Sequence, residues 1–270
     1  MQRDLAQKLS DGDTIFGTCV TSASPHWPEA VATTGVDFVF IDTEHIPIDR
    51  ATLATMCSIY RSLRLSPIVR ITSSDPYLAV MAKDAGAVGV MMPYVERAAQ
   101  VRALVGATKF RPLKGQKLEA ILQGNEVPDE TLLHYLKQYN PSSLAWINVE
   151  SVAAVENLDH LLAVPGLDGV IIGPHDLSVS LGFPEQYHHP VFEKTVAGIV
   201  ERVRAAGLAA GIHYSGDIAF QQKWLSQGIN VVLHSSDIFL FVSRLRNDLL
   251  QLKGASQSEC KGRQDSSPVI

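Results

Sequence analysis

One stretch of the chain, residues 38–45, reads Phe38-Val39-Phe40-Ile41-Asp42-Thr43-Glu44-His45. Its first four residues are apolar without alternation, which is typical of a strand buried on both faces, as in a parallel sheet. Polar residues follow at once. The stretch therefore predicts a buried parallel strand whose carboxyl end presents Asp42 and His45.

Three other stretches repeat this pattern of an apolar run that ends in a charged residue. They are residues 67–70, ending in Arg70, residues 144–150, ending in Glu150, and residues 170–176, ending in Asp176. Because the carboxyl ends of parallel strands meet on one side of a fold, we expect these side chains to converge. Such a convergence of charged groups indicates a site and not a core.

Apolar runs alternate with amphipathic segments along most of the chain. The predicted strands lie near residues 15–20, 37–42, 67–71, 88–92, 143–149, 168–172, 208–212 and 230–233, and the predicted helices include residues 50–62, 75–85, 96–107, 190–206, 217–227 and 236–252. Eight strand–helix repeats in about 250 residues predict an α/β fold, the (β/α)8 TIM barrel. A doubly wound open sheet is the main alternative, disfavoured because no G-x-G-x-x-G turn follows the first strand.

Two segments do not fit the repeat. Residues 108–128 form a polar insertion after the fourth strand, and we expect it on the rim where barrel loops carry function. Residues 254–270 are polar and contain glycine and serine, which predicts a disordered C-terminal tail behind a single barrel domain of residues 1–253.

The composition excludes several classes of partner. The net charge is −5 and no long basic run occurs, so no nucleic-acid partner is expected. No apolar stretch approaches the roughly 18 residues that a membrane span needs, and the N-terminal residues lack the apolar core of a signal peptide. The three cysteines, Cys19, Cys57 and Cys260, fit neither a disulfide framework nor a zinc cluster, which favours a cytoplasmic protein.

The converging residues suggest metal chemistry. Glu150 and Asp176 would end neighbouring strands, and two carboxylates without histidine or thiolate suit Mg²⁺ or Mn²⁺. Such an ion would bind a 2-oxo acid through its carboxylate and keto oxygens and stabilise the enolate as a Lewis acid. Arg70 adds a planar donor fork for the ligand's oxygens. His45 is the natural proton-transfer group, and Asp42 is placed to orient it.

Each assignment has a structural alternative. Asp176 is also placed to cap the helix that follows it, and Glu150 to pair with a buried basic residue. Arg70 could instead form an ion pair with Asp42 or Glu44.

Two further histidines, His213 and His234, end strands seven and eight and are candidates for the same rim. No lysine ends a predicted strand, which disfavours an imine-forming aldolase.

Together these segments resemble the HpcH/HpaI aldolase family, the metal-dependent (class II) pyruvate aldolases that cleave 4-hydroxy-2-oxo acids. The resemblance covers roughly residues 5–250 and rests on D-x-E-H at residues 42–45 and G-P-x-D-L-S at residues 173–178. It implies a pyruvate/phosphoenolpyruvate-type barrel. It makes Glu150 and Asp176 ligands of a divalent cation (Mg²⁺, Mn²⁺ or Co²⁺), Arg70 a pyruvate contact, and His45 with Asp42 the acid/base pair.

The resemblance implies further contacts. Backbone amides around Gly173, Pro174 and His175 would hold the pyruvate carboxylate. The protein would be a homo-oligomer, often a hexamer in this family, in which the last helix packs onto a neighbour's barrel.

Two departures from the family pattern fall where the mouth is expected. Gly115-Gln116-Lys117-Leu118 replaces the usual G-x-R-G turn, and Asn148 replaces a glutamine. Lys117 is therefore a candidate for binding the electrophile.

The sequence thus predicts a divalent-metal-dependent lyase that cleaves or forms a bond between the enolate of pyruvate (or a similar 2-oxo acid) and an aldehyde. One alternative is a citrate-synthase-like or CoA-ester Claisen enzyme, for which a basic mouth would be formed by Lys109, Arg111, Lys114 and Lys117. The other is a non-catalytic protein that binds 2-oxo acids.

Overall fold

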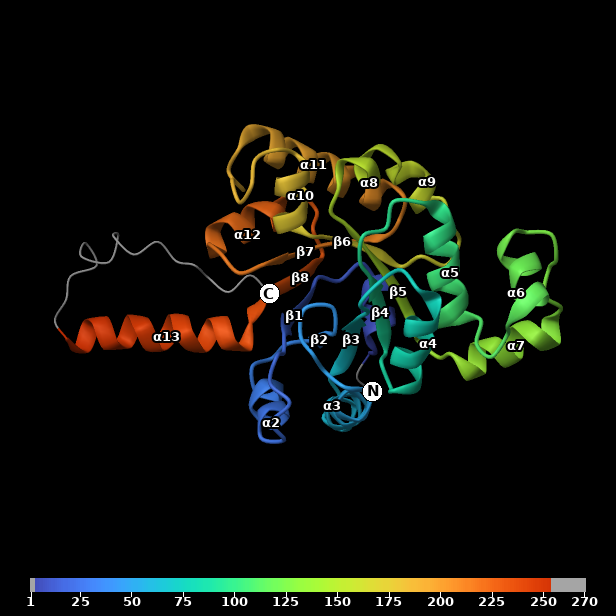
Figure 1. Ribbon diagram of the computed structural model, residues 1–270, viewed down its shortest axis with the longest axis horizontal. Helices are drawn as coiled ribbons and strands as arrows, with labels where there is room; N and C mark the ends of the chain where they lie inside the picture. Colours follow the sequence, from blue (N-terminus) through green and yellow to red (C-terminus); the bar gives the residue numbers. More distant parts are fainter. Residues whose placement is uncertain (1–2, 254–270) are drawn as a thin grey trace.

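The structure, a computed structural model, describes residues 3–253 and contains a closed barrel of eight parallel strands (Figure 1). The strands are β1 (Ile15–Cys19), β2 (Phe38–Asp42), β3 (Ser66–Arg70), β4 (Gly89–Met92), β5 (Leu144–Val149), β6 (Gly169–Ile172), β7 (Ala209–Tyr214) and β8 (Val231–Ser236). Each strand pairs with the next in the chain, and β8 closes the barrel on β1. The predicted TIM barrel is confirmed.

Helices connect or flank the strands, and several of them pack on the outside of the barrel. They are α1 (Leu5–Ser10), α2 (Trp27–Ala32), α3 (Arg50–Ser62), α4 (Pro76–Asp84), α5 (Ala98–Lys109), α6 (Gly115–Leu122), α7 (Glu130–Tyr139), α8 (Val152–Glu156), α9 (Leu158–Leu162), α10 (Pro174–Ser180), α11 (Pro190–Ala205), α12 (Ile218–Ser226) and α13 (Asp237–Leu252). The six helices expected from the sequence are all present. The sequence does not predict the helices of five to seven residues, because such short segments carry little periodic signal. It also does not predict α6 and α7, which lie in and just after the polar insertion.

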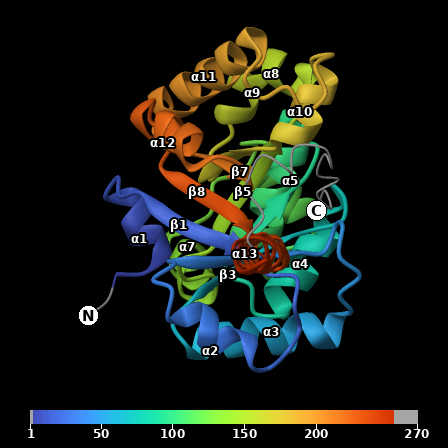
Figure 2. The same ribbon diagram turned by 90° about the vertical axis from the view of Figure 1, so that its left-hand side faces the viewer.

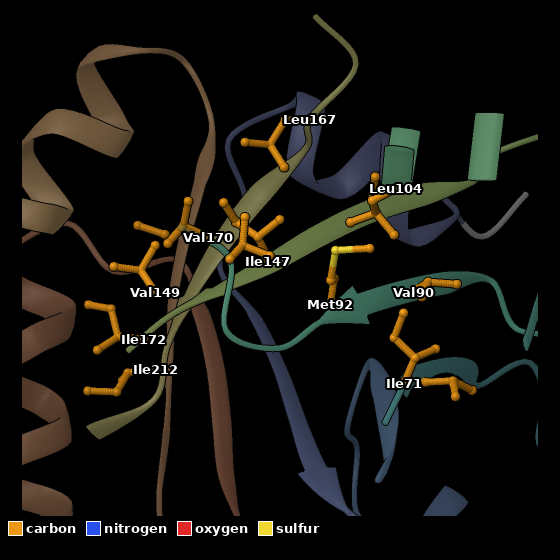
Figure 3. Packing of buried hydrophobic residues seen from close by; sticks show 14 of the residues in the cluster. Ile71, Val90, Met92, Leu104, Ile147, Val149, Leu167, Val170, Ile172 and Ile212 are labelled. Carbon is orange, nitrogen blue, oxygen red and sulfur yellow. The ribbon is translucent and has the colours of Figure 1, made fainter. Parts of the chain in front are cut away.

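Side chains alternate between two apolar layers because successive strand residues point to opposite faces. Inside the barrel, the rings of Phe38 and Trp146 pack edge to face, with centroids 5.7 Å apart. The outer layer lies between strands and helices, where Met92 of β4 and Ile147 of β5 pack near Leu104 of α5 (Figure 3). The continuous burial of β2, β4, β5 and β6 follows from this two-sided packing.

The insertion at residues 108–128 lies away from the predicted rim. It begins at the end of α5, which returns the chain to the amino ends of the strands. There Lys109 Nζ lies 2.7 Å from Asp168 Oδ1, just before β6, and the Asn140 side chain donates to the carbonyls of Lys109 and Arg111 just before β5. Figure 1 shows α6 and α7 at the end of the molecule opposite α13. The prediction that this insertion borders the active-site mouth of its own barrel is wrong.

The last helix, α13, projects away from the barrel, lengthwise in Figure 1 and end-on in Figure 2. Only its first residue, Asp237, is buried. Among residues 3–253, no helix is long and apolar enough to cross a membrane. The predicted disordered tail, residues 254–270, lies outside the described residues.

Candidate active site at the carboxyl ends of the strands

The residues that end β2 and β3 form a buried ion pair. Asp42 and Arg70 are register partners, with Arg70 Nε 2.9 Å from Asp42 Oδ1 and Nη2 2.5 Å from Oδ2. The carboxylate is 1% exposed and the arginine 7%. Burial by itself would raise the pKa of Asp42, but the hydrogen bond and charge of Arg70 outweigh burial and hold that pKa below its usual value. Asp42 is therefore an anion that fixes the guanidinium plane.

Glu44 links this pair to the histidine. Its Oε2 lies 3.1 Å from Arg70 Nε and 3.7 Å from His45 Nε2. Burial raises the pKa of Glu44, and Arg70 opposes this effect. The His45 side chain is 48% exposed, so it reaches toward solvent at the mouth. The carboxylate beside the imidazole is thus Glu44, whereas the sequence predicted Asp42, both of whose oxygens contact Arg70.

The two predicted metal ligands meet at Tyr94, just beyond β4. The Tyr94 N–H donates to Glu150 Oε1 at 2.7 Å, and its hydroxyl lies 3.4 Å from Asp176 Oδ1. Glu150 follows β5 and is 2% exposed, while Asp176 lies in the first turn of α10 after β6. Burial, together with the charges of Asp176 and Glu150, raises the pKa of Tyr94 to about 12, so its hydroxyl stays protonated near neutral pH.

The acid pair has the features of a cation site. Burial, aided by the charge of Asp176 and opposed by the Tyr94 N–H, raises the pKa of Glu150 to about 7. Its second oxygen, Oε2, is buried and has no hydrogen-bond partner among the described residues. A buried carboxylate oxygen without a partner is unfavourable unless a cation or donor occupies the space beside it. The pair therefore fits a divalent cation that keeps several waters or substrate oxygens, since residues 3–253 offer no cluster of three His, Cys, Asp or Glu ligands.

Gly173 makes room for Glu150. A Cβ atom at Gly173 would collide with Glu150 Oε2 and lie 3.0 Å from its Cβ. Gly173 is also the residue before α10, with Pro174 at the first helical position. Proline has no N–H, so Pro174 offers no amide to a ligand, and the donors of this turn are the amides of His175 and Asp176.

The side chains of the remaining candidates make other contacts. The Lys117 side chain is 53% exposed on α6 and lies 3.7 Å from Glu126, at the far end of the barrel. His175 Nδ1 lies 3.5 Å from Glu185 Oε1. His234 contacts Gln221 of α12.

Of the two histidines on β7 and β8, His213 is the one that lies near the Asp42–Arg70 ion pair. Its ring packs edge-on against Phe40 inside the barrel, with centroids 5.7 Å apart, and Nε2 lies 3.3 Å from the carbonyl oxygen of Ser235. Burial and the charge of Arg70 lower its pKa to about 4.

Tyr94 is the site residue that the sequence did not reveal. It is not charged, and it follows a proline beyond a strand without belonging to a motif. The available signal was its position, two residues past β4, on the same rim as the four charged strand ends.

The comparisons with known proteins agree with the fold. A sequence model of the HpcH/HpaI aldolase/citrate lyase family matches residues 16–243. A 2-keto-3-deoxy-L-rhamnonate aldolase of Salmonella gallinarum is 35% identical over 245 residues, which are 91% of this chain and 91% of that protein.

Two solved structures are similar throughout. An HpcH/HpaI aldolase from Desulfitobacterium hafniense DCB-2 has a TM-score of 0.81 at 26% identity, over 95% of this chain and 99% of that one. The citrate synthase SbnG has a TM-score of 0.80 at 28% identity, over 94% of this chain and 98% of that one. The chain therefore belongs to the HpcH/HpaI aldolase/citrate lyase family, and it is a carbon–carbon lyase.

Proposed function

We propose that this protein is a divalent-metal-dependent aldolase that cleaves a 4-hydroxy-2-oxo acid to pyruvate, or a similar 2-oxo acid, and an aldehyde. The observation that carries the proposal is the pairing of buried Glu150 with partly buried Asp176: Glu150 Oε2 has no hydrogen-bond partner among residues 3–253, and the charge of Arg70 acts on Glu150. Carboxylates alone bind hard cations, and Arg70 supplies the fixed positive charge for a substrate anion.

The substrate class follows from the relatives. Those at 35–36% identity over 91% of this chain are named 2-keto-3-deoxy-L-rhamnonate aldolases. A 2-keto-3-deoxy sugar acid carries the 2-oxo group and a carbon chain with hydroxyls beyond C3, which is the pattern that retro-aldol cleavage needs. We infer that sugar acids of this class are the first substrates to test.

Glu150 and Asp176 would hold the cation, which is Mg²⁺, Mn²⁺ or Co²⁺ in this proposal. When bound, the cation neutralises the negative charge that develops on the 2-oxo group as the bond between C3 and C4 breaks. Arg70 contributes a second positive charge. Its contacts with Asp42 and Glu44 use Nε and Nη2, so Nη1 is the nitrogen left to face the substrate.

The amides of His175 and Asp176 would receive the substrate carboxylate. They belong to the first turn of α10, where N–H groups have no carbonyl acceptor within the helix. Gly173 supports this end of the site by leaving space for Glu150.

His45 would transfer the proton. In the cleavage direction it accepts the proton of the C4 hydroxyl as the aldehyde forms, and in the synthetic direction it returns that proton. Glu44, 3.7 Å from Nε2, stabilises the protonated imidazole. Asp42 would act through Arg70, because it holds the guanidinium that Glu44 also contacts.

The Claisen alternative loses its main support from the sequence. The basic residues expected to form a mouth for an acyl-CoA lie in or beside the insertion at the amino end of the barrel. Arg111, for example, pairs with Asp84 at the end of α4. The likeness to SbnG, a citrate synthase, keeps acetyl-CoA among the compounds worth assaying.

A direct assay tests the proposal. The protein is stripped with EDTA, reloaded with Mg²⁺, Mn²⁺ or Co²⁺, and assayed for pyruvate release from 2-keto-3-deoxy sugar acids. Pyruvate is also incubated with an aldehyde panel, with and without acetyl-CoA. We expect activity only with metal, lost in Glu150→Gln and Asp176→Asn, and no dependence on acetyl-CoA. Full activity in excess EDTA, or a substrate imine trapped by borohydride, would contradict the proposal.

We also propose that the protein is a homo-oligomer in which α13 packs on a second copy. This helix exposes seven apolar side chains, each at least 41% exposed: Ile238, Leu240, Phe241, Val242, Leu245, Leu249 and Leu252. Clustered exposed apolar residues of this kind mark interaction surfaces. Light scattering should give the mass of an oligomer, a hexamer by the family resemblance, and Phe241→Glu with Leu245→Glu should reduce it.

A cytoplasmic location is supported by cysteine chemistry. Cys19 and Cys57 are both buried and unpaired, as expected where thiols stay reduced. Fractionation of the producing cells tests this directly.

A further inference from the structure

Tyr94 contacts both members of the acid pair, from a position just beyond β4, a strand that neither of them follows. Its backbone N–H donates to Glu150 Oε1 at 2.7 Å, and its phenolic oxygen lies 3.4 Å from Asp176 Oδ1. Glu150 follows β5 and Asp176 follows β6, while Tyr94 follows β4. One residue therefore connects three successive strand ends.

The backbone of Tyr94 is unusual. Its φ of 48° lies in the left-handed region, where a bulky side chain is a genuine outlier. Such conformations persist only where the surroundings fix them, and they cluster at functional sites. The neighbouring contacts that fix it are the Val95 N–H to the Asn148 carbonyl at 3.4 Å and the Gln100 side chain to the Tyr94 carbonyl at 3.5 Å.

The acid pair needs such a support. Glu150 and Asp176 carry like charges that repel at short range in a partly desolvated site. A donor on each carboxylate from the same residue holds the two groups in one arrangement before a cation arrives. Tyr94 is itself 50% exposed, so this support for the acid pair stands at the surface of the protein.

We propose that Tyr94 is a positioning residue that fixes Asp176 relative to Glu150 and thereby sets the affinity of the site for a divalent cation. The inference rests on the proposed metal site. In this proposal the phenolic hydroxyl holds Asp176, and the left-handed backbone of Tyr94 directs its N–H to Glu150. Residues that hold metal ligands in this way change metal affinity when they are removed, although they do not touch the metal.

The test measures Mn²⁺ binding to metal-free protein by electron paramagnetic resonance, without substrate and without turnover. Tyr94→Phe keeps the ring and the backbone N–H but removes the hydroxyl. We expect its dissociation constant for Mn²⁺ to rise about tenfold, with an unchanged melting temperature of the metal-free protein. Tyr77→Phe is the matched control, since Tyr77 lies in the first turn of α4 after β3 and is 62% exposed. It should bind Mn²⁺ as the wild type does.

A double-mutant cycle shows whether the effect passes through Asp176. Asp176→Asn weakens Mn²⁺ binding on its own because it removes a charged ligand. If Tyr94 acts by positioning Asp176, adding Tyr94→Phe to Asp176→Asn should cause a much smaller further loss than it causes in the wild type.

A glycine at the same position separates the strain from the contact. Tyr94→Gly keeps the N–H donor to Glu150 and relieves the left-handed strain, so the metal-free protein should melt no lower than Tyr94→Phe. Its Mn²⁺ affinity should still be at least as weak as that of Tyr94→Phe, because the hydroxyl is gone.

The outcomes distinguish the two proposals. Unchanged Mn²⁺ affinity in Tyr94→Phe, or an equal loss in the wild-type and Asp176→Asn backgrounds, would overturn the role of Tyr94 and leave the metal site intact. Wild-type protein that binds no Mn²⁺ would overturn the metal site itself and, with it, this inference.

Discussion

The guanidinium of Arg70 and the carboxylate of Asp42 are held face to face by two contacts, Nε to Oδ1 at 2.9 Å and Nη2 to Oδ2 at 2.5 Å. The two residues are register partners on β2 and β3, so the barrel itself sets their distance. Glu44 Oε2 also contacts Nε, at 3.1 Å. Only a planar fork makes these contacts and still presents a further N–H to a ligand.

Arg70→Lys should therefore retain the positive charge but lose the planar donor geometry on which the site depends. Without any aldehyde, the loaded enzyme should exchange pyruvate methyl protons with deuterated solvent, which proton NMR follows. We expect the exchange rate to fall about 100-fold in Arg70→Lys, as for the loss of one fixed donor at a developing anion. Lysine is preferable to alanine here, because Arg70→Ala would leave Asp42 charged and unpaired while 1% exposed, at a cost of about 3–5 kcal/mol in stability.

A surface pair supplies the control. Arg202 also contacts an aspartate through two nitrogens, Nε and Nη2, both 2.9 Å from Asp159 Oδ1, but that aspartate side chain is 79% exposed. Arg202→Lys should leave the exchange rate unchanged. Full exchange in Arg70→Lys would place Arg70 in a purely structural role.

We expect the carboxylate of Asp237, at the start of α13, to contribute to the stability of the fold. Asp237 is 7% exposed and accepts from Thr21 N–H and Oγ1, from Ser22 N–H and from its own neighbour Ile238 N–H. Asp237→Ala should lower the free energy of unfolding by about 2–3 kcal/mol, because partly buried donors lose a charged acceptor. Urea unfolding followed by circular dichroism measures the loss.

Asp248, on the same helix, provides the comparison. It pairs with Arg244 one turn away on the surface, and its side chain is 41% exposed. Asp248→Ala should change the unfolding free energy by no more than about 0.5 kcal/mol. Equal effects of the two substitutions would contradict the role of Asp237.

The barrel could be predicted because its strands are buried on both faces. Runs such as residues 38–41 and 170–172 have no polar alternation, and an amphipathic segment follows or precedes each run. The insertion was misplaced for a topological reason. The sequence argument places the insertion directly after the fourth strand, at the carboxyl ends of the strands. In the structure α5 lies between them and carries the chain to the opposite end of the barrel.

The sequence predicts only part of the site. Charged residues at strand ends were found, since a polar group that ends a buried run stands out. The sequence does not reveal how these residues pair. Asp42 and Glu44 are both expected near Arg70 and His45, and only side-chain geometry shows that Glu44 is the carboxylate beside the imidazole. The backbone N–H of Tyr94 carries no side-chain signature at all.

His213 should make stability depend on pH. Its pKa is lowered to about 4 by burial and by Arg70, below the ordinary value of 6.5, so the unfolded chain binds its proton more readily between these values. Stability should therefore fall as the pH drops from about 6.5 to about 4, with a slope of at most about 1.4 kcal/mol per pH unit from this residue. Above pH 6.5 both states are neutral and the contribution is constant.

His213→Gln tests this, since glutamine keeps an N–H donor and does not titrate. Other groups titrate in both proteins, so the difference between the two curves of unfolding free energy against pH isolates the histidine. The difference should change between pH 4 and 6.5 and be flat above that range. A flat difference throughout would mean that His213 is not held neutral by the fold.

Gly173→Ala should damage the cation site without touching a charged residue. The new Cβ would overlap Glu150 Oε2 and press on Glu150 Cβ, so the carboxylate must leave its position. We expect the dissociation constant for Mn²⁺ to rise at least about tenfold, as for other changes that displace a ligand.

Gly198→Ala is the control, because a Cβ on that residue of α11 meets no atom within 4 Å. Alanine in a helix interior should stabilise the protein by up to about 1 kcal/mol and leave Mn²⁺ binding unchanged. Normal Mn²⁺ affinity in Gly173→Ala would show that Glu150 has room to move and that its position does not limit metal binding.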